Sequence, residues 1–266
     1  MRKKLGMLFI IIAMLLFCFL LCKYVPLFLD YAKSKKLYNE IEEEYVTPDT
    51  EPDNSQEAQM EALLLGIDHK KNEFAPIDVD GEALLDENAD YIGWIYAPKT
   101  DISYPVVQSR DNSDYLHTDF YRNYSFPGTV FMDCRCLSGV LSHHSILYGH
   151  NMNNGTMFAG LKSYRDQQFA EEHPVFWFIT PKYKLLYKVF AVCNANPYDS
   201  VEYGVDGTDY RNNQEFLDAM NAIKSNSIVS IESDIKSTDY VMSLSTCTEN
   251  SSVRCIVHGI LLGSVG

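Results

Sequence analysis

The chain has 266 residues, 46% of them hydrophobic, and a formal net charge of −14. The charge is unevenly spread, because residues 1–36 hold seven of the 22 Lys and Arg residues and one of the 36 acidic residues, which leaves 15 basic against 35 acidic residues in the remainder. Because such an acidic surface repels nucleic acids and anionic lipid head groups, we expect no nucleic-acid partner.

The N-terminus predicts a membrane anchor. Three basic residues at positions 2–4 precede an apolar run from Leu5 to Cys22, and apolar residues resume after Lys23 through Leu29. At ~1.5 Å per residue, such a helix crosses a hydrocarbon core of ~30 Å. A cleaved signal peptide is the alternative, but the run is longer than is usual there and no small-residue cleavage site follows it. We therefore expect residues 1–30 to be a single-pass transmembrane anchor, with the rest of the chain outside the cell.

Residues 31–83 are expected to form a juxtamembrane region of helix and linker. Tyr31–Tyr45 is charged and helix-prone, and Thr47–Ser55 is rich in turn-forming residues. Gln56–Ile67 is a second helical stretch.

From about residue 84, short runs of β-branched and aromatic residues alternate with turn-forming residues, which predicts strands. The runs are Tyr91–Tyr96, Ile102–Gln108, Gly128–Asp133, Ser145–Gly149, Val175–Thr180, Leu185–Asn194, Ile228–Glu232, Tyr240–Thr246 and Arg254–Leu262. Apolar residues recur at helical spacing over Asn212–Lys224, which predicts a helix lying on the sheet. The pattern favours one mainly β domain over residues 84–266, a barrel or sandwich with peripheral helices.

The cysteines do not form a disulfide scaffold. Two of the seven, Cys18 and Cys22, lie in the apolar run, and the other five are an odd number. Cys134 and Cys136 are alternate residues of an apparent strand, too close in sequence to bridge easily. No C-x-x-C motif occurs, so the sequence supports no structural zinc site, and we expect neither metal nor cofactor.

Cys247 is the candidate nucleophile. If the last two predicted strands form a hairpin centred between Asn250 and Ser251, Cys247 lies opposite Arg254, with Cβ atoms about 5 Å apart. A guanidinium beside a thiol favours the nucleophilic thiolate, or donates to an oxyanion. The alternative is a packed, inert cysteine, which suits Cys255 with its apolar neighbours better than Cys247 in its polar setting. The residues alone leave both interpretations of Cys247 open.

A thiol nucleophile needs an acid and base for its leaving group, and His150 is the best candidate among seven histidines. It stands where an apolar strand opens into a Gly- and Asn-rich loop, a usual place for functional side chains. His143 and His144 lie in the polar turn before that strand, where we expect solvated side chains, and His258 is expected to be structural. The others, His69, His117 and His173, have no distinctive setting.

The Cys247 strand and the His150 loop belong to a set of motifs in a fixed order. The first is Ser243-Leu244-Ser245-Thr246-Cys247 followed by Arg254; the others are Tyr104–Gln108, Phe131–Asp133, Tyr148–Met152 and Gly155–Phe158. In these motifs, from about Asp90 to Leu262, the chain resembles the sortases, and among them class B. Sortases carry a T-L-x-T-C strand, a later Arg and an upstream catalytic His. Here Ser243 replaces the usual Thr, the interval to Arg254 is short for class B, and an assisting role for an acid at Glu249 stays open.

The resemblance implies a closed sortase-type β-barrel and a membrane-anchored cysteine transpeptidase. Cys247 would attack the carbonyl of a Thr in a sorting motif near the C-terminus of a secreted protein, with Arg254 stabilising the oxyanion and His150 protonating the departing amine. An amine of the cell-wall peptide, or of its lipid-linked precursor, would then release the thioacyl enzyme.

The resemblance also implies that Asn112 and Leu116 line the peptide groove, with Ser245 and Thr246 as further candidates beside the nucleophile. For Asn112 a helix N-cap is an equal alternative. Two other functions stay open: a membrane-anchored cysteine peptidase that only hydrolyses, and a non-catalytic anchored binding module.

Overall fold

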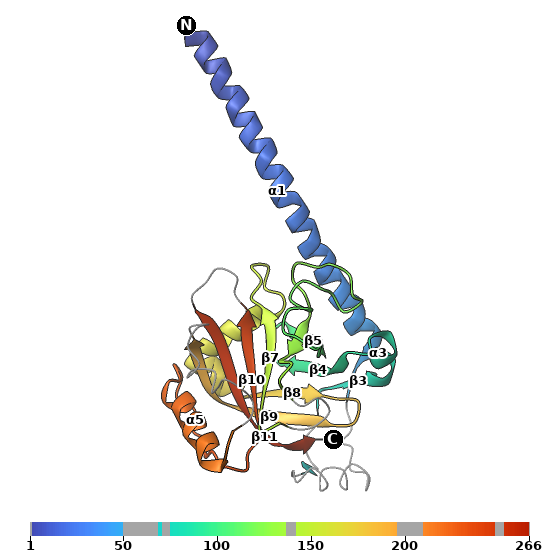
Figure 1. The fold of residues 1–266 in the computed structure, drawn as a ribbon, viewed down its shortest axis with the longest axis vertical. Helices are drawn as coiled ribbons and strands as arrows, with labels where there is room; N and C mark the ends of the chain where they lie inside the picture. The colour runs from blue at the N-terminus through green and yellow to red at the C-terminus, as the bar shows by residue number, and fades with distance from the viewer. Residues whose placement is uncertain are drawn as a thin grey trace.

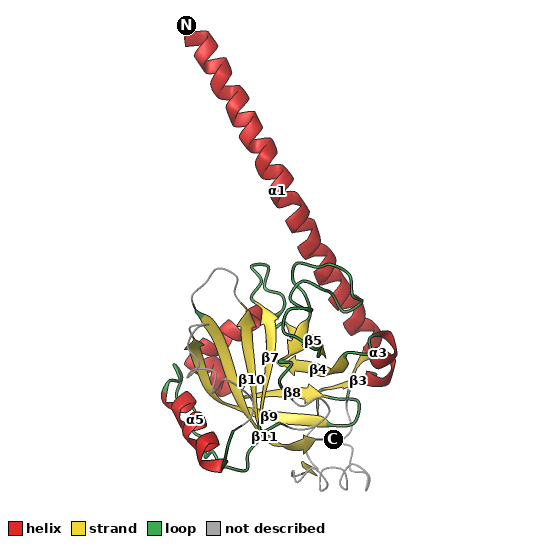
Figure 2. Ribbon diagram, viewed as in Figure 1, coloured by secondary structure: helices red, strands yellow, loops and turns green. Residues whose placement is uncertain are grey.

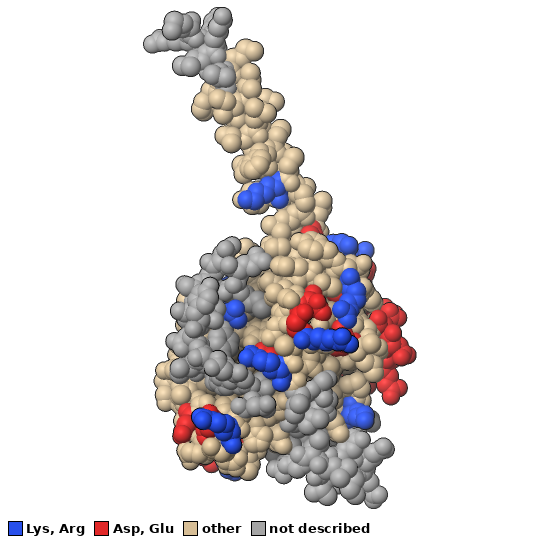
Figure 3. All heavy atoms as spheres, in the orientation of Figure 1, with Lys and Arg blue, Asp and Glu red and all other residues tan. Residues whose placement is uncertain are grey.

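One long helix, α1 (Arg2–Tyr45), projects from a body of strands (Figures 1 and 2). The structure is a computed structural model that describes residues 2–49, 69–70, 75–136, 142–195, 210–247 and 253–265. Large apolar side chains of the projecting part, from Phe9 (74% exposed) to Leu29 (60%), face outward, and Figure 3 shows almost no charge along it. By length and composition, α1 is the one helix among the described residues that is suited to cross a membrane.

The C-terminal part of α1 packs on the barrel. The buried residues Ser34, Tyr38 and Ile41 recur every three or four positions, with Tyr31 and Tyr45 half-buried on the same side. The helix predicted over Tyr31–Tyr45 is therefore confirmed, but it continues the apolar segment without a break, through Pro26. The change at about residue 30 is one of side-chain chemistry rather than of secondary structure.

Short elements join α1 to the barrel. β1 (Val46–Pro48) pairs antiparallel with β3 (Ile77–Val79), so Thr47 and Pro48 form a strand where a turn-rich break was expected. The helix predicted over Gln56–Ile67 lies outside the described residues. β2 (His69–Lys70) pairs with the final strand. The helix α3 (Gly81–Glu87) has Asp80 as its N-cap, and the Asp80 carboxylate accepts the Ala83 N–H.

Eight of the described strands close into a barrel. Their order is β10-β7-β6-β5-β4-β8-β9-β11, and β10 also pairs with β11. The bounds are β4 (Tyr91–Ala97), β5 (Ile102–Val107), β6 (Val130–Met132), β7 (His144–His150), β8 (Val175–Ile179), β9 (Lys184–Ala195), β10 (Val241–Cys247) and β11 (Arg254–Val265). The predicted mainly β fold, a closed barrel with peripheral helices, is confirmed.

Two local predictions are wrong. Residues 228–232 form no strand: the Ile228 N–H donates to the Val192 carbonyl and Val229 is buried in the core, so packing rather than sheet pairing explains their apolar pattern. Cys134 and Cys136 follow the end of β6 on a turn, which the Cys136 N–H closes by donating to the Asp133 carbonyl.

Apolar side chains fill the barrel and also cover part of its outside. The interior cluster includes Trp94, Phe176 and Leu244.

The remaining described helices lie between strands. Between β7 and β8 the chain forms the 3₁₀ helix η1 (Phe158–Arg165) and α4 (Gln167–Glu172). The predicted helix is α5 (Asn213–Ser225), and its apolar stripe packs on the outside of the barrel, in a cluster separate from the interior.

Candidate active site at the ends of β7, β10 and β11

Cys247 ends the strand that lies between β7 and β11. In the parallel pairing with β7, the backbone of Cys247 is level with that of His150, the last residue of that strand. In the antiparallel pairing with β11, Ser245 is opposite Ile256, and continuing the register by two residues puts Cys247 opposite Arg254. The backbones of the three predicted catalytic residues therefore meet at one end of three adjacent strands.

A side chain ties β10 to β11 one residue before this point. Thr246 is 1% exposed, and its hydroxyl oxygen accepts the N–H of Cys255 at 3.0 Å. Arg254 opens β11, is half-buried, and pairs on its other side with Ala195 of β9. The strand that carries Arg254 is thus held on both edges.

The imidazole of His150 has a fixed orientation. It is 8% exposed, and its Nε2 lies 2.9 Å from the carbonyl oxygen of Leu116. A carbonyl oxygen only accepts, so Nε2 carries the proton in this contact, and Nδ1 is the atom of the neutral ring that can take up a proton. The ring also stacks on His117, with centroids 5.4 Å apart, and on Phe126 at 6.2 Å.

Close packing around His150 requires glycine at two positions. A Cβ at Gly149 would lie 2.7 Å from the Cγ of the buried ring of Phe158, so the strand needs glycine at this position. Gly128 has φ +61°, and a Cβ there would lie 2.4 Å from the carbonyl oxygen of Leu116, the same oxygen that binds His150.

A buried polar network lies along the same strands. The Ser243 hydroxyl is 2.7 Å from both His144 Nε2 and His258 Nδ1, and His144 Nδ1 is 2.8 Å from the hydroxyl of Tyr210. The expectation that His144 is solvated is wrong, because it begins β7 and is fully buried. His143 is exposed as expected, and His258, for which we expected a structural role, is fully buried.

Burial keeps both network histidines neutral. It lowers the pKa of His144 to about 4 and, with His144 nearby, the pKa of His258 to about 3. Ser243, which replaces the Thr usual at this position of the motif, supplies the hydroxyl that joins the two histidines.

The predicted groove residues have different surroundings. Ser245 is completely buried, and its hydroxyl has no hydrogen-bond partner within the described part of the chain, whereas the Thr246 hydroxyl accepts the Cys255 N–H. Leu116 is half-buried and its carbonyl contacts His150. The structure thus brings Leu116, Ser245 and Thr246 next to the predicted catalytic residues.

Asn112 holds the turn after β6 instead. Its side-chain oxygen accepts the Cys134 N–H at 2.7 Å. The helix N-cap alternative is wrong, since no helix follows and the local turn is capped by Asp111, whose carboxylate accepts the N–H groups of Ser113 and Asp114. Glu249 lies outside the described residues.

Sequence reasoning missed His117 and Phe126, which pack on the ring of His150. Both lie in the long connection between β5 and β6, whose residues show no periodic pattern. Nothing local indicates their role, because their contact with His150 depends on β6 pairing with both β5 and β7.

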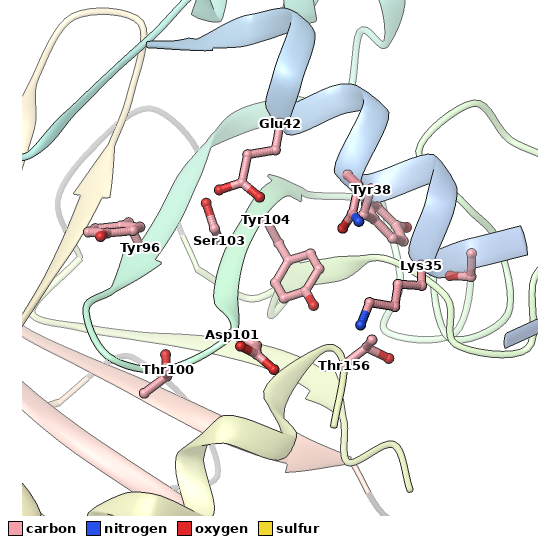
Figure 4. Close-up of a pocket in the computed structure, with 11 residues that line it drawn as sticks. Lys35, Tyr38, Glu42, Tyr96, Thr100, Asp101, Ser103, Tyr104 and Thr156 are labelled. Carbon is pink, nitrogen blue, oxygen red and sulfur yellow. The ribbon is translucent and has the colours of Figure 1, made fainter. Parts of the chain in front are cut away.

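A separate hollow of about 300 Å³ lies between α1 and the β4–β5 hairpin (Figure 4). Its walls include Lys35, Tyr38, Asp101 and Tyr104, and none of the predicted site residues. Thr156 is its one contribution from the loop after His150. The strand ends, not this hollow, hold the candidate chemistry.

Comparisons with known proteins show which family the sequence and the fold of this chain match. Residues 95–262 match the family model described as a Sortase domain. The chain is 31% identical to Sortase B of Staphylococcus aureus over 79% of this chain and 82% of that protein, and 30% identical to Sortase B of Listeria monocytogenes over 66% and 71%. Among solved structures, a Staphylococcus aureus sortase B–substrate complex superposes with a TM-score of 0.70 at 27% identity, covering 88% of this chain and 99% of the other.

Proposed function

This chain belongs to the sortase family as a class B cysteine transpeptidase, and we propose that it cleaves a C-terminal sorting motif of secreted proteins after a Thr and joins the Thr carbonyl to an amine of the cell wall. The observation that carries the proposal is the strand register, which sets the backbone of Cys247 beside that of His150 on one edge of β10 and opposite Arg254 on the other.

In the first step the thiolate of Cys247 attacks the carbonyl carbon of the Thr. The carbonyl oxygen becomes an oxyanion, which the guanidinium of Arg254 stabilises. The C–N bond then breaks as the protonated ring of His150 gives the proton on Nδ1 to the departing amine. A thioester on Cys247 and a free C-terminal fragment result.

In the second step an amine resolves the thioester. Its nitrogen attacks the thioester carbonyl, His150 accepts a proton from that nitrogen, and Cys247 leaves as a thiolate. The product is a new amide bond, and the enzyme returns to its starting state. We propose an amine of the cell-wall peptide, or of its lipid-linked precursor, as the acceptor.

For the groove, we propose Ser245 as the strongest of the four candidate residues, because its buried hydroxyl has no hydrogen-bond partner among the residues that the structure describes. Leu116 and Asn112 would contribute from the β5–β6 connection, and Thr246 mainly keeps β11 in register. The relative solved as a substrate complex supports a peptide groove in this fold.

We propose residues 1–30 as a single-pass anchor, residues 31–83 as the juxtamembrane region and residues 84–266 as the catalytic domain. The apolar, projecting part of α1 supports the anchor. In Figure 1 the loop after β7 lies on the side of the barrel from which α1 projects, so the site would face the membrane surface where secreted substrates emerge.

The test uses the purified full chain in detergent micelles, a library of peptides containing a central Thr, and an amine-terminated acceptor peptide, with products read by mass spectrometry. We expect a ligated product in which the Thr carbonyl is joined to the acceptor. Hydrolysis without ligation would indicate a peptidase instead, and an inert protein would indicate a binding module.

The matched variants are Cys247→Ala and Cys134→Ala, the latter a half-buried thiol on the turn after β6. Ligation should disappear with the first and persist with the second. Ligation by Cys247→Ala at the wild-type rate would contradict the mechanism.

A further inference from the structure

The barrel-bound part of α1 begins with a contact to the β5–β6 connection. The carboxylate of Asp30 accepts the backbone N–H of Phe126 at 2.8 Å, across 96 positions of sequence. The next residue, Tyr31, places its ring 5.7 Å from the ring of Phe126. Two neighbouring residues of the helix thus bind the backbone and the side chain of one loop residue.

A second contact lies two turns further along α1. The hydroxyl of Tyr38 donates to the Gly128 carbonyl at 2.6 Å and lies 2.9 Å from the hydroxyl of Thr129. Burial raises the pKa of Tyr38 well above its usual value, so the hydroxyl stays a donor at all physiological pH values. Gly128 is in turn packed against the carbonyl of Leu116.

The same loop residues hold His150. Phe126 stacks on His117 at 5.4 Å and on His150 at 6.2 Å. His117 donates from Nδ1 to the Phe126 carbonyl at 2.9 Å and stacks on His150 at 5.4 Å with an angle of 18° between the rings. These stacked rings and the Leu116 carbonyl form a continuous set of contacts from α1 to His150.

We propose that Asp30, Tyr31 and Tyr38 are positioning residues for the imidazole of His150. Asp30 and Tyr31 act through Phe126 and His117, and Tyr38 acts through Gly128 and the Leu116 carbonyl. The inference rests on the proposed role of His150 as acid and base. The physical reason is the length of the β5–β6 connection, since a long loop without regular structure needs outside contacts to stay in one conformation. Proton transfer depends steeply on the placement of the acid and base. The helix that carries the apolar segment is therefore part of the active-site framework.

The test compares truncating with conservative variants in the full chain, in detergent micelles. Asp30→Ala, Tyr31→Ala and His117→Ala remove a contact, whereas Asp30→Asn, Tyr31→Phe and His117→Phe keep the acceptor or the ring. Lys33→Ala is the matched control, because Lys33 is exposed on the same turn of α1. The substrate is a peptide cleaved by the wild type, and kcat is expressed per Cys247 thiol that forms a thioester with this peptide, so that loss of folded protein does not enter the rate.

We expect the alanine variants to lower kcat about tenfold with KM for the peptide unchanged, and to alter the pH profile of kcat. The conservative variants and Lys33→Ala should stay within twofold of the wild type. A merely structural contribution would lower the melting temperature without changing kcat per thiol or the pH profile, and that result would overturn the inference.

The His150→Ala variant separates this inference from the proposed function. If it abolishes transfer while Asp30→Ala and Tyr31→Ala keep the wild-type kcat, the positioning role is wrong and the proposed function stands. If His150→Ala itself keeps transfer, the assigned role of His150 fails, and the positioning role with it.

Discussion

The Nε2 atom of His150 lies 2.9 Å from the carbonyl oxygen of Leu116, a residue 34 positions earlier in the chain. This contact selects the tautomer and the orientation of the ring, so Nδ1 is the nitrogen that would carry out the proposed proton exchange. Any change that moves the Leu116 carbonyl is therefore expected to misplace the proposed acid and base.

Gly128→Ala tests that relationship. The new Cβ would meet the Leu116 oxygen at 2.4 Å, so we expect kcat to fall by at least ~10-fold and stability to fall by ~1–3 kcal/mol. Gly155→Ala is the control, because Gly155 also has a positive φ, +86°, but its Cβ would meet only Asp101 Oδ2, at 3.9 Å. Peptide-transfer kinetics and thermal unfolding measure both effects. Equal loss of kcat in the two variants would point to backbone strain rather than to the Leu116 contact.

Ser245→Ala should separate substrate binding from stability. The Ser245 hydroxyl is buried without a hydrogen-bond partner in the described ranges, so its removal is expected to leave the free energy of unfolding unchanged or slightly higher. If the hydroxyl binds the sorting peptide, KM rises several-fold. Thr246→Val is the contrasting variant: it leaves the Cys255 N–H without its acceptor and should cost ~1–3 kcal/mol of stability. Peptide kinetics and urea unfolding test the pair, and an unchanged KM in Ser245→Ala would remove Ser245 from the groove.

Arg254 is expected to act on the transition state. Arg254→Ala should lower kcat by ~10²–10³-fold, the usual loss when an oxyanion donor is removed. Arg254→Lys keeps the charge but not the forked donor geometry, so we expect partial activity. Arg211→Ala, just before the first residue of α5, is the control, because Arg211 is exposed and its ion pair among the described residues is with Glu215 of that helix. A dominant effect of Arg254→Ala on KM would assign the residue to substrate binding instead.

The buried histidines predict loss of stability in acid. Their folded pKa values, about 4 for His144 and about 3 for His258, lie below the usual value of ~6.5, so the unfolded chain binds protons that the folded chain does not. Their stabilising contribution is complete above pH ~6.5 and decreases as the pH falls toward 4, with a slope that approaches ~1.4 kcal/mol per pH unit for each histidine.

Urea unfolding between pH 7 and pH 4 measures this slope. His144→Gln and His258→Gln should each flatten it, whereas His143→Gln, at an exposed position, should leave it unchanged. A slope that is the same in all three variants would assign the acid sensitivity to other groups.

The sequence by itself determined the local part of this site. The alternation of side chains in two strands predicted to form a hairpin is enough to put Cys247 opposite Arg254, and the register of β10 and β11, continued from Ser245 and Ile256, agrees with that count. The same short-range patterns predicted most strands of the barrel and the apolar stripe of α5. In both cases the side chains that share one face recur at short, regular intervals along the sequence.

Only the tertiary structure decided which distant residues surround His150. Parallel strands pair without a tight turn between them, so no local count could align His150 with Cys247, bury His144 against Ser243, or place His117 and Phe126 on the His150 ring. The contact of Asp30 with Phe126 likewise joins segments that no periodic pattern relates. Such pairings are set by closure of the barrel and by packing of α1 on it, and these depend on the whole chain at once.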